Sequence, residues 1–334
     1  MSFLSGLFKR NRASKKRDAL REPERFDFSG FSGTFLNIPT RDMFGQFERS
    51  PNERFLLVWR DRMQHTTGNR TEEIPGRYML FDGGVFVCEG KMARPQDGKV
   101  ADDGTFMLND WHTYTGELSS TFRAFRADGS LVLATTYKAN LYNNGLSRNG
   151  RWAACQTCEA PHEADGSILT VFDLAVGAER ARWRAEIGWP DGYSFADDGS
   201  KVVLSTRDLG EFAFSLEGEF LDRAAWQNAA ISAGSVHIVS RILAEMEAAP
   251  DPDIPRRILL GLNAALKNSK NADDRPRAYI LKLQGDCFDR LNNLPAALRC
   301  YELALRLNPK VGAKRRSQQI CKIVESASDR SAPR

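Results

Sequence analysis

The spacing of hydrophobic and polar positions changes once along this chain of 334 residues. Up to about residue 224, short apolar or β-branched runs follow polar turn pairs, a pattern typical of strands joined by tight hairpins. From about residue 230, apolar positions recur every three or four residues, which predicts amphipathic helices. We therefore expect a basic tail over 1–25, a mainly-β domain over 26–228 and an all-α domain over 229–334.

Four turn pairs mark a repeat within the β region. Their second residues are 51, 46 and 49 positions apart, and the pairs are Asn52-Glu53, Asp103-Gly104, Asn149-Gly150 and Asp198-Gly199. Asn-Gly and Asp-Gly supply the positive φ that tight hairpin turns require. A second marker agrees, because Phe172-Asp173 follows Phe81-Asp82 by 91 residues, or about two repeats.

A repeat of nearly fifty residues that holds several strands resembles one blade of the β-propeller family, of WD40-like or kelch-like type. The resemblance covers about residues 44–224 and implies about four blades. The chain departs from the family because no Trp-Asp dipeptide ends each repeat, and an extra turn at Asp128-Gly129 interrupts the spacing. Residues 26–40 would then add a closing strand, or the sheets would stack as an open array, and a β-sandwich is the alternative fold.

The segment 278–311 resembles one tetratricopeptide repeat. Small residues at Gly285, Ala297 and Ala304 allow its two helices to approach closely, and Pro309 ends the second helix. One such unit cannot bury its own apolar face, so neighbouring helices are required. We expect four or five helices in all, ending in a capping helix that turns Ile320, Ile323 and Val324 inward.

The resemblance implies a groove, lined by the first helix of each repeat, that holds a partner's peptide. The implied groove residues are Tyr279, Lys282, Asp286, Asp289 and Arg290. Members that grip acidic C-terminal tails carry a basic residue fifth and an asparagine ninth; Lys282 fits that pattern, whereas Asp286 would repel a carboxylate. The alternative interpretation is that these residues form a solvated charged face.

Charge and cysteine content narrow the class of protein. The formal net charge is +4, but residues 1–25 and 310–334 each carry +5, which leaves −6 in residues 26–309. This distribution argues against a broad nucleic-acid-binding face on the folded part. Six cysteines are too sparse for a disulfide framework, and no run approaches the roughly 18 apolar residues of a membrane span. We expect a cytoplasmic protein.

Motifs that carry catalysis or hold cofactors are absent. The spacing of Cys155, Cys158 and His162 superficially suggests a metal site. A structural zinc site requires four ligands, however, and no second pair of cysteines follows in the sequence. Glycine-rich phosphate loops and the nucleophile elbow are also missing. We therefore expect no catalytic residues, metal or cofactor, and a scaffold or adaptor that binds partner proteins through a propeller-like platform and a helical groove. The alternative is a hydrolase or transferase with a pocket at the propeller mouth that includes His65 or His112.

The N-terminal tail predicts contact with the inner face of a membrane. On a helix, Phe3, Leu4, Leu7 and Phe8 form one apolar cluster, and Lys9 and Arg10 begin a basic run directly after it. Each base near an anionic surface contributes about 1 kcal/mol, and partial burial of four large side chains adds several more, enough for reversible adhesion. A disordered tail, or a helix that docks on a partner protein, remains the alternative.

Deletion of residues 2–17 tests the tail hypothesis. The full chain should sediment with anionic liposomes, and the deletion should abolish sedimentation because it removes both the apolar cluster and the bases. Equal sedimentation of the two proteins would contradict membrane contact through the tail.

Overall fold

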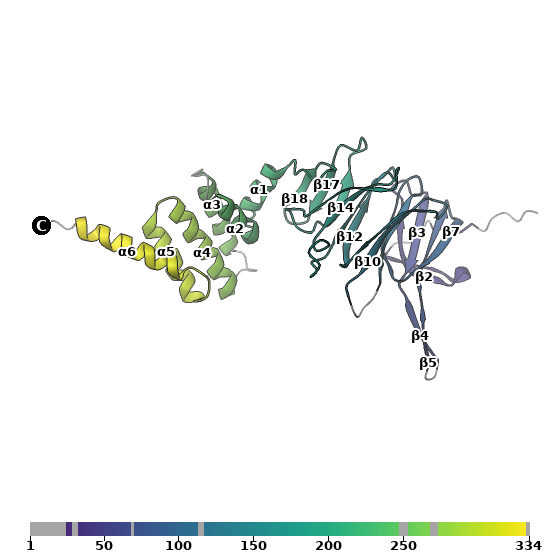
Figure 1. The fold of residues 1–334 in the computed structure, drawn as a ribbon, viewed down its shortest axis with the longest axis horizontal. Helices are drawn as coiled ribbons and strands as arrows, with labels where there is room; N and C mark the ends of the chain where they lie inside the picture. Colours follow the sequence, from purple (N-terminus) through teal and green to yellow (C-terminus); the bar gives the residue numbers. More distant parts are fainter. Residues whose placement is uncertain are drawn as a thin grey trace, which may run out of the picture.

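The computed structural model describes residues 25–28, 33–67, 70–112, 117–246, 253–267 and 273–331. An N-terminal region of several antiparallel β-sheets is followed by a C-terminal region of helices (Figure 1). The predicted membrane-contact residues of the tail lie outside the described residues; they are Phe3, Leu4, Leu7, Phe8, Lys9 and Arg10. Within those ranges, no helix combines the length and the hydropathy that crossing a membrane would need.

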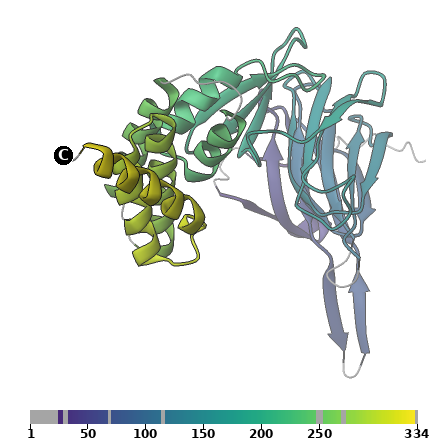
Figure 2. The ribbon, with the colours of Figure 1, turned by 60° about the vertical axis from the view of Figure 1, so that its left-hand side comes forward.

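The first sheet has five strands in the spatial order β1-β2-β3-β6-β7. They are β1 (Phe35–Ile38), β2 (Met43–Arg49), β3 (Phe55–Arg60), β6 (Gly76–Asp82) and β7 (Val85–Met92), with the 3-10 helix η1 (Pro39–Arg41) between β1 and β2. Strands β4 (Met63–Thr67) and β5 (Arg70–Ile74) form a separate hairpin that projects away from the body (Figure 2).

Three further sheets follow, and in each of them strands adjacent in sequence are adjacent in space and antiparallel. The second sheet holds β8 (Pro95–Val100), β9 (Phe106–Trp111), β10 (Ser120–Phe125) and β11 (Leu131–Tyr137). The third holds β12 (Leu141–Leu146), β13 (Trp152–Thr157), β14 (Leu169–Asp173) and β15 (Ala178–Trp183). The fourth holds β16 (Gly192–Phe195), β17 (Val202–Thr206) and β18 (Gly210–Phe214). The four sheets are stacked in chain order, so the strands do not form a two-sheet sandwich (Figure 1).

The predicted turn pairs join β2 to β3, β8 to β9, β12 to β13 and β16 to β17. The second residue of each pair has a positive φ: 60° at Glu53, 84° at Gly104, 72° at Gly150 and 69° at Gly199. The predicted positive φ is therefore confirmed at the three Asn-Gly and Asp-Gly pairs, and Glu53 adopts the same conformation without a glycine. The extra turn joins β10 to β11 inside the second sheet, with a φ of 84° at Gly129.

Hydrogen bonds between neighbouring sheets connect residues that are about one repeat apart. The Asn52 backbone N–H donates to Asp102 Oδ1 at 2.7 Å, 50 residues along the chain. Arg148 Nε donates to Asp102 Oδ2 at 2.6 Å across 46 residues, and the Tyr193 hydroxyl donates to Asn143 Oδ1 at 2.7 Å across 50. Each sheet is therefore placed on the next in nearly the same register.

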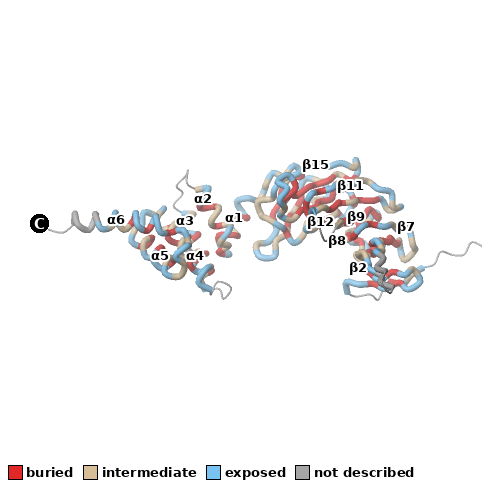
Figure 3. The backbone as a smooth tube through the Cα atoms, turned by 60° about the horizontal axis from the view of Figure 1, so that its bottom comes forward, coloured by how far each residue is buried: buried red, intermediate tan, exposed pale blue. Residues whose placement is uncertain are grey.

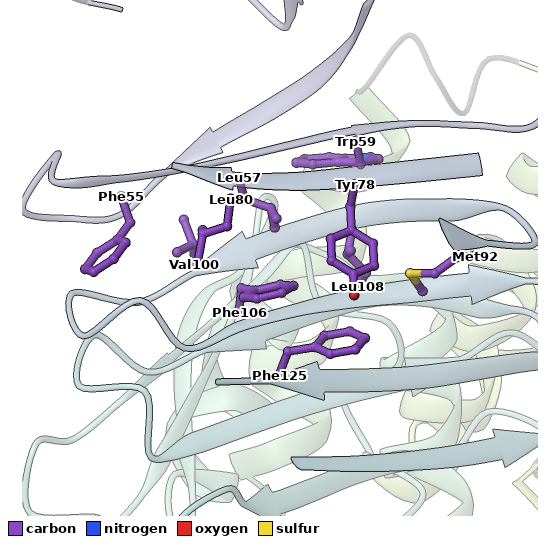
Figure 4. Close-up of a cluster of buried hydrophobic side chains, with 10 residues drawn as sticks. All are labelled: Phe55, Leu57, Trp59, Tyr78, Leu80, Met92, Val100, Phe106, Leu108 and Phe125. Carbon is purple, nitrogen blue, oxygen red and sulfur yellow. The ribbon is translucent and has the colours of Figure 1, made fainter. Parts of the chain in front are cut away.

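Hydrophobic side chains fill the spaces between successive sheets. Between the first two sheets, Trp59 and Tyr78 share a core with Phe106 and Phe125, whose rings stack 4.9 Å apart (Figure 4). The second and third sheets share the stacked pair Phe122 and Phe172, and Trp152, Val171, Leu204 and Phe214 belong to the core between the third and fourth. Figure 3 shows the buried residues along the interior of the stack. Burial of each large side chain contributes about 1.5–3 kcal/mol, so these cores hold the stack together.

The stack does not close into a ring within the described residues. At one end, β1 pairs with β2 and its Leu36 and Ile38 cover the outer face of the first sheet, so this segment supplies no closing strand. At the other end, the Ala213 N–H donates to Asp222 Oδ2 at 2.8 Å, and the Leu221 N–H donates to the Ala213 carbonyl at 3.0 Å. These bonds occupy the edge of β18, and the chain then enters the first helix.

Six helices lie in the described ranges, where four or five were expected. They are α1 (Arg223–Ser232), α2 (Val236–Glu245), α3 (Asp253–Lys267), α4 (Asp274–Arg290), α5 (Leu294–Leu307) and α6 (Lys314–Ser331). Helix α1 begins six residues before the predicted boundary at 229, and its alanine-rich sequence shows no clear apolar stripe. In the capping helix α6, Ile320 is buried as predicted, but Ile323 is 45% exposed and does not point fully inward.

Helices α4 and α5 approach each other at a glycine. A Cβ built on Gly285 would lie 2.5 Å from Cε1 of Tyr301, and the two tightly packed alanines Ala297 and Ala304 are fully buried on the facing helix. The close approach predicted from these small residues is confirmed.

Substitution of Gly285 by Ala tests this packing through the sign of the stability change. Without a neighbour, the alanine would stabilise the helix by about 0.5–1 kcal/mol. Overpacking against Tyr301 should instead lower the free energy of unfolding by about 1–2 kcal/mol, measured as a lower Tm of the full chain. In a Tyr301→Leu background the loss should shrink, and a higher Tm for Gly285→Ala alone would contradict the packing.

Candidate partner-binding surfaces

Helix α4 carries all five residues predicted to line a groove, and two of them contact α2. The Tyr279 and Ser240 hydroxyls are 2.8 Å apart. Arg290 Nη2 donates to the Leu243 carbonyl at 2.7 Å, in the last turn of α2, where the helix dipole favours a cation. These two contacts hold α2 alongside α4.

Of the other three predicted groove residues, Asp286 contacts α5, Asp289 contacts α6, and Lys282 pairs with Asp286 within α4. Lys282 Nζ lies 2.6 Å from Asp286 Oδ2, and the Tyr301 hydroxyl donates to Asp286 Oδ1 at 2.8 Å. Burial, reinforced by the Asp286 carboxylate, raises the pKa of Tyr301 well above its usual range, so the hydroxyl stays protonated and donates. Asp289 accepts two hydrogen bonds from Arg316 of α6, at 2.6 and 2.7 Å.

All five groove candidates therefore have partners within the helical region. The polar atoms of Tyr279, Asp286, Asp289 and Arg290 connect α4 to α2, α5 and α6, which gives these four a structural role beside the predicted one. Tyr279 differs from the others because it also lines an open cavity.

This cavity, the junction groove, has a volume of about 1160 Å³ and lies between the fourth sheet and the helices. Its lining includes Trp189, Arg207, His237, Arg275 and Tyr279. The ring of Trp189 is 42% exposed and is held by a hydrogen bond from Nε1 to the Thr157 carbonyl at 3.0 Å. Aromatic surface next to cationic side chains is a composition common in partner-binding sites.

Electrostatic contacts distinguish the two arginines of the junction groove. Arg207 pairs with Asp191, with an N to O distance of 3.2 Å, and both belong to the sheet side. Arg275 is exposed in the first turn of α4 and makes no ion pair with any residue that the structure describes. Arg275 is therefore the arginine of this groove that no described carboxylate pairs with.

Contacts around α1 join the sheet region to the helices beside the junction groove. The Trp226 side chain is almost fully buried, its ring lies 5.6 Å from that of Phe220, and the Arg241 guanidinium lies over it at 5.0 Å. Arg241 also donates to the Glu186 carbonyl at 3.1 Å, and Arg223 pairs with the Glu186 carboxylate. The loop between β15 and β16, the segment after β18 and helices α1 and α2 therefore share one set of contacts.

Tyr279 was predicted from the sequence, but the groove residues on the sheet side were not. Trp189 lies in the loop between β15 and β16, and Arg207 lies in the turn between β17 and β18. The signal available in the sequence was the Trp-Pro-Asp run at 189–191, which places a large aromatic residue in a turn.

Of the three candidates Cys155, Cys158 and His162, the side chains of Cys155 and His162 contact other residues of the fold, and Cys158 is a half-buried free cysteine. Cys155 is buried in β13, lies 3.5 Å from the Tyr137 hydroxyl, and has its pKa raised to about 12 by burial. His162 Nδ1 lies 3.3 Å from Asp165. Across the described ranges, no group of three or more His, Cys, Asp or Glu side chains is arranged to hold a metal ion.

The histidines named for the enzymatic alternative provide no specific support for it. The ring nitrogens of His112 lie 2.8 Å from Ser119 Oγ and 2.9 Å from Thr121 Oγ1, so both are engaged within the fold. The side chain of His65 lies outside what the structure describes.

Comparison with protein-family models finds no match to this chain, and a search of curated proteins finds none either.

Arg290 allows the structural role of the groove candidates to be measured. Replacement by Met keeps most of the aliphatic stem but removes the donor to the Leu243 carbonyl, which should lower the free energy of unfolding by about 1 kcal/mol in denaturant titration. Arg299, an exposed arginine of α5, provides the matched control, and Arg299→Met should change stability by less than about 0.5 kcal/mol. Equal effects of the two substitutions would contradict the assigned contact.

Proposed function

We propose that this chain is a non-catalytic cytoplasmic adaptor that holds a segment of a partner protein in the junction groove. The observation that carries the proposal is the groove itself, which is lined by an exposed tryptophan of the sheet region and by Tyr279 and Arg275 of α4. Such a surface combines apolar anchoring with one cation that has no ion-pair partner among the described residues.

The helical region supports the adaptor proposal through its resemblance to tetratricopeptide arrays. Helix α2 contacts α4 through Arg290, and α6 contacts α4 through Arg316, so α2, α4 and α6 line one side of the array. In such arrays this side receives the partner. Because Lys282, Asp286 and Asp289 are paired along the length of α4, the partner segment would enter at the N-terminal end, beside Tyr279.

The sheet region supports the proposal as a platform. We interpret the four stacked sheets as an open, propeller-like array, because the hydrogen bonds between sheets span one repeat of 46 to 50 residues. Such an array exposes strand edges and turns over a broad surface, which suits protein contacts.

Charge favours a partner segment with acidic residues. Residues 223–334 hold 19 Lys and Arg against 11 Asp and Glu, a net charge of +8. Residues 25–222 hold 21 Lys and Arg against 29 Asp and Glu, a net charge of −8. The groove lining itself holds Arg207 and Arg275 against Asp191 and Asp208, so an acidic segment would be attracted to Arg275 on the helical side and not to the groove as a whole.

The adaptor proposal is tested by using the chain and its variants as bait in extracts of the native cell and quantifying the proteins that each one recovers. Trp189→Ala and Arg275→Glu should each reduce the recovery of the partner at least about tenfold, because each removes a central contact of the groove. Leu303→Ala and Arg299→Glu alter exposed residues of α5 away from the groove and should leave recovery unchanged. Recovery of the same proteins in the same amounts by all four variants would contradict binding in the junction groove.

A further inference from the structure

Strands β1 and β2 carry large apolar residues on both faces, but only one of the two faces is covered. Leu36, Ile38 and Met43 are buried in the core on the outer face of the first sheet. On the opposite face, Phe35 is 53% exposed and Phe44 is 62% exposed. A strand with one solvated face normally alternates apolar and polar residues. The two phenylalanines therefore indicate that another segment covers this second face.

Phe35 and Phe44, the aromatic pair, lie on the same face of the first sheet as Trp59. Phe35 pairs with Gln46 and Gln46 pairs with Trp59, and residues directly opposite each other share one face. Phe44 lies two residues before Gln46, so its side chain is on that face too. The rings of the aromatic pair are stacked, with centroids 5.6 Å apart and planes 12° from parallel. They form one apolar surface at the edge of the sheet.

A cavity of about 450 Å³, the edge cavity, lies beside the aromatic pair. Its lining includes Phe35, Phe44, Trp59 and Met63, and the Met63 side chain is itself 48% exposed. Because a cavity of about 150 Å³ holds one benzene ring, the edge cavity has room for more than one large side chain.

The charged side chains of the edge cavity disfavour a basic occupant. Arg60 and Arg62 belong to the lining, and Arg62 pairs with Glu73 at 3.5 Å. Asp61 is the one carboxylate among the described lining residues, and it pairs with Arg94 at 2.9 Å. The edge cavity therefore recognises its occupant through apolar contacts.

Residues 1–24 precede the described part of the chain, and their sequence contains a segment of the required chemistry. Four large apolar residues, the tail cluster, stand within six positions: Phe3, Leu4, Leu7 and Phe8. Each of the other ranges outside the described residues holds at most one aromatic residue and no such cluster; these ranges are 29–32, 68–69, 113–116, 247–252, 268–272 and 332–334.

The tail is long enough for the tail cluster to reach the edge cavity. Arg25 bridges Val85 at the start of β7, so the described chain begins at one edge of the first sheet, and β1 is the other edge. These edges are four strand spacings apart, or about 19 Å. Residues 9–24 connect the tail cluster to Arg25 and span up to about 53 Å when fully extended. This length allows the tail to pass around the edge of the sheet.

We propose that the tail cluster docks in the edge cavity of the same chain. Its large side chains contact the aromatic pair, and the bases that begin at Lys9 stay outside the cavity, away from Arg60 and Arg62. The docked segment covers the second face of β1 and β2. Because the tail cluster is also the segment predicted to contact a membrane, docking in the edge cavity withholds it from a membrane.

Photocrosslinking of the full chain in dilute solution without membranes tests this docking. Phe8→benzoylphenylalanine places the crosslinker in the tail cluster, and mass spectrometry maps the residues that it captures. Crosslinks should form within one chain and fall mainly in 35–46 and 59–63, which line the edge cavity. Crosslinks between two copies, crosslinks mainly to other segments, or no crosslinks at all would overturn the proposal.

Substitutions in the cavity and in the tail show whether apolar contacts produce the crosslinks. Phe35→Ser combined with Phe44→Ser should lower the yield at 59–63 at least about fivefold, because it removes the aromatic pair. Phe3→Ser combined with Leu4→Ser should lower it similarly and leaves the described part of the chain unaltered. Leu131→Ser changes a residue of β11 that is 54% exposed and should leave the yield unchanged. Equal yields in all of these proteins would overturn the proposal, and thermal melts confirm that each one is folded.

Discussion

The contact between sheets that lie one repeat apart is the constraint on which the structure depends. A single antiparallel sheet of four strands leaves two apolar faces exposed, and the stack buries them only if successive sheets keep the same register. Asp102 shows how this register is set, since it accepts from Asn52 on one side and from Arg148 on the other. The turns that form each hairpin therefore also align each sheet on the next.

The two ends of the stack determine that the sheets stay open and that the helices follow the last sheet. A ring would require the first and last sheets to meet, but β1 covers one end and Asp222 occupies the edge of β18 at the other. The same segment then starts α1, whose buried Trp226 packs beside the fourth sheet. The helices are thereby placed against the end of the stack, and the junction groove is a consequence of that placement.

The sequence predicted the local features of the fold better than its surfaces. The turns at Gly104, Gly150 and Gly199 were predictable because positive φ depends on residues adjacent in the chain. The close approach at Gly285 was predictable because helical spacing determines which residues share a face. Pairing of Asp289 with Arg316, and of Arg290 with the Leu243 carbonyl, was not predictable, because it depends on how separate helices pack. Trp189 and Arg275 were missed for the same reason, since they meet only when the sheets and the helices are assembled.

The central claim is that a partner binds in the junction groove. Hydrogen–deuterium exchange of the full chain, with and without the partner recovered in the pull-down, tests this claim most directly. Binding in the junction groove should slow exchange together in four separate segments, at 187–191, 206–209, 233–237 and 275–279, because all four line the same cavity. Protection along the whole of α4 and α6 with no change at 187–191 and 206–209 would contradict the account, because it would place the partner on the helices alone.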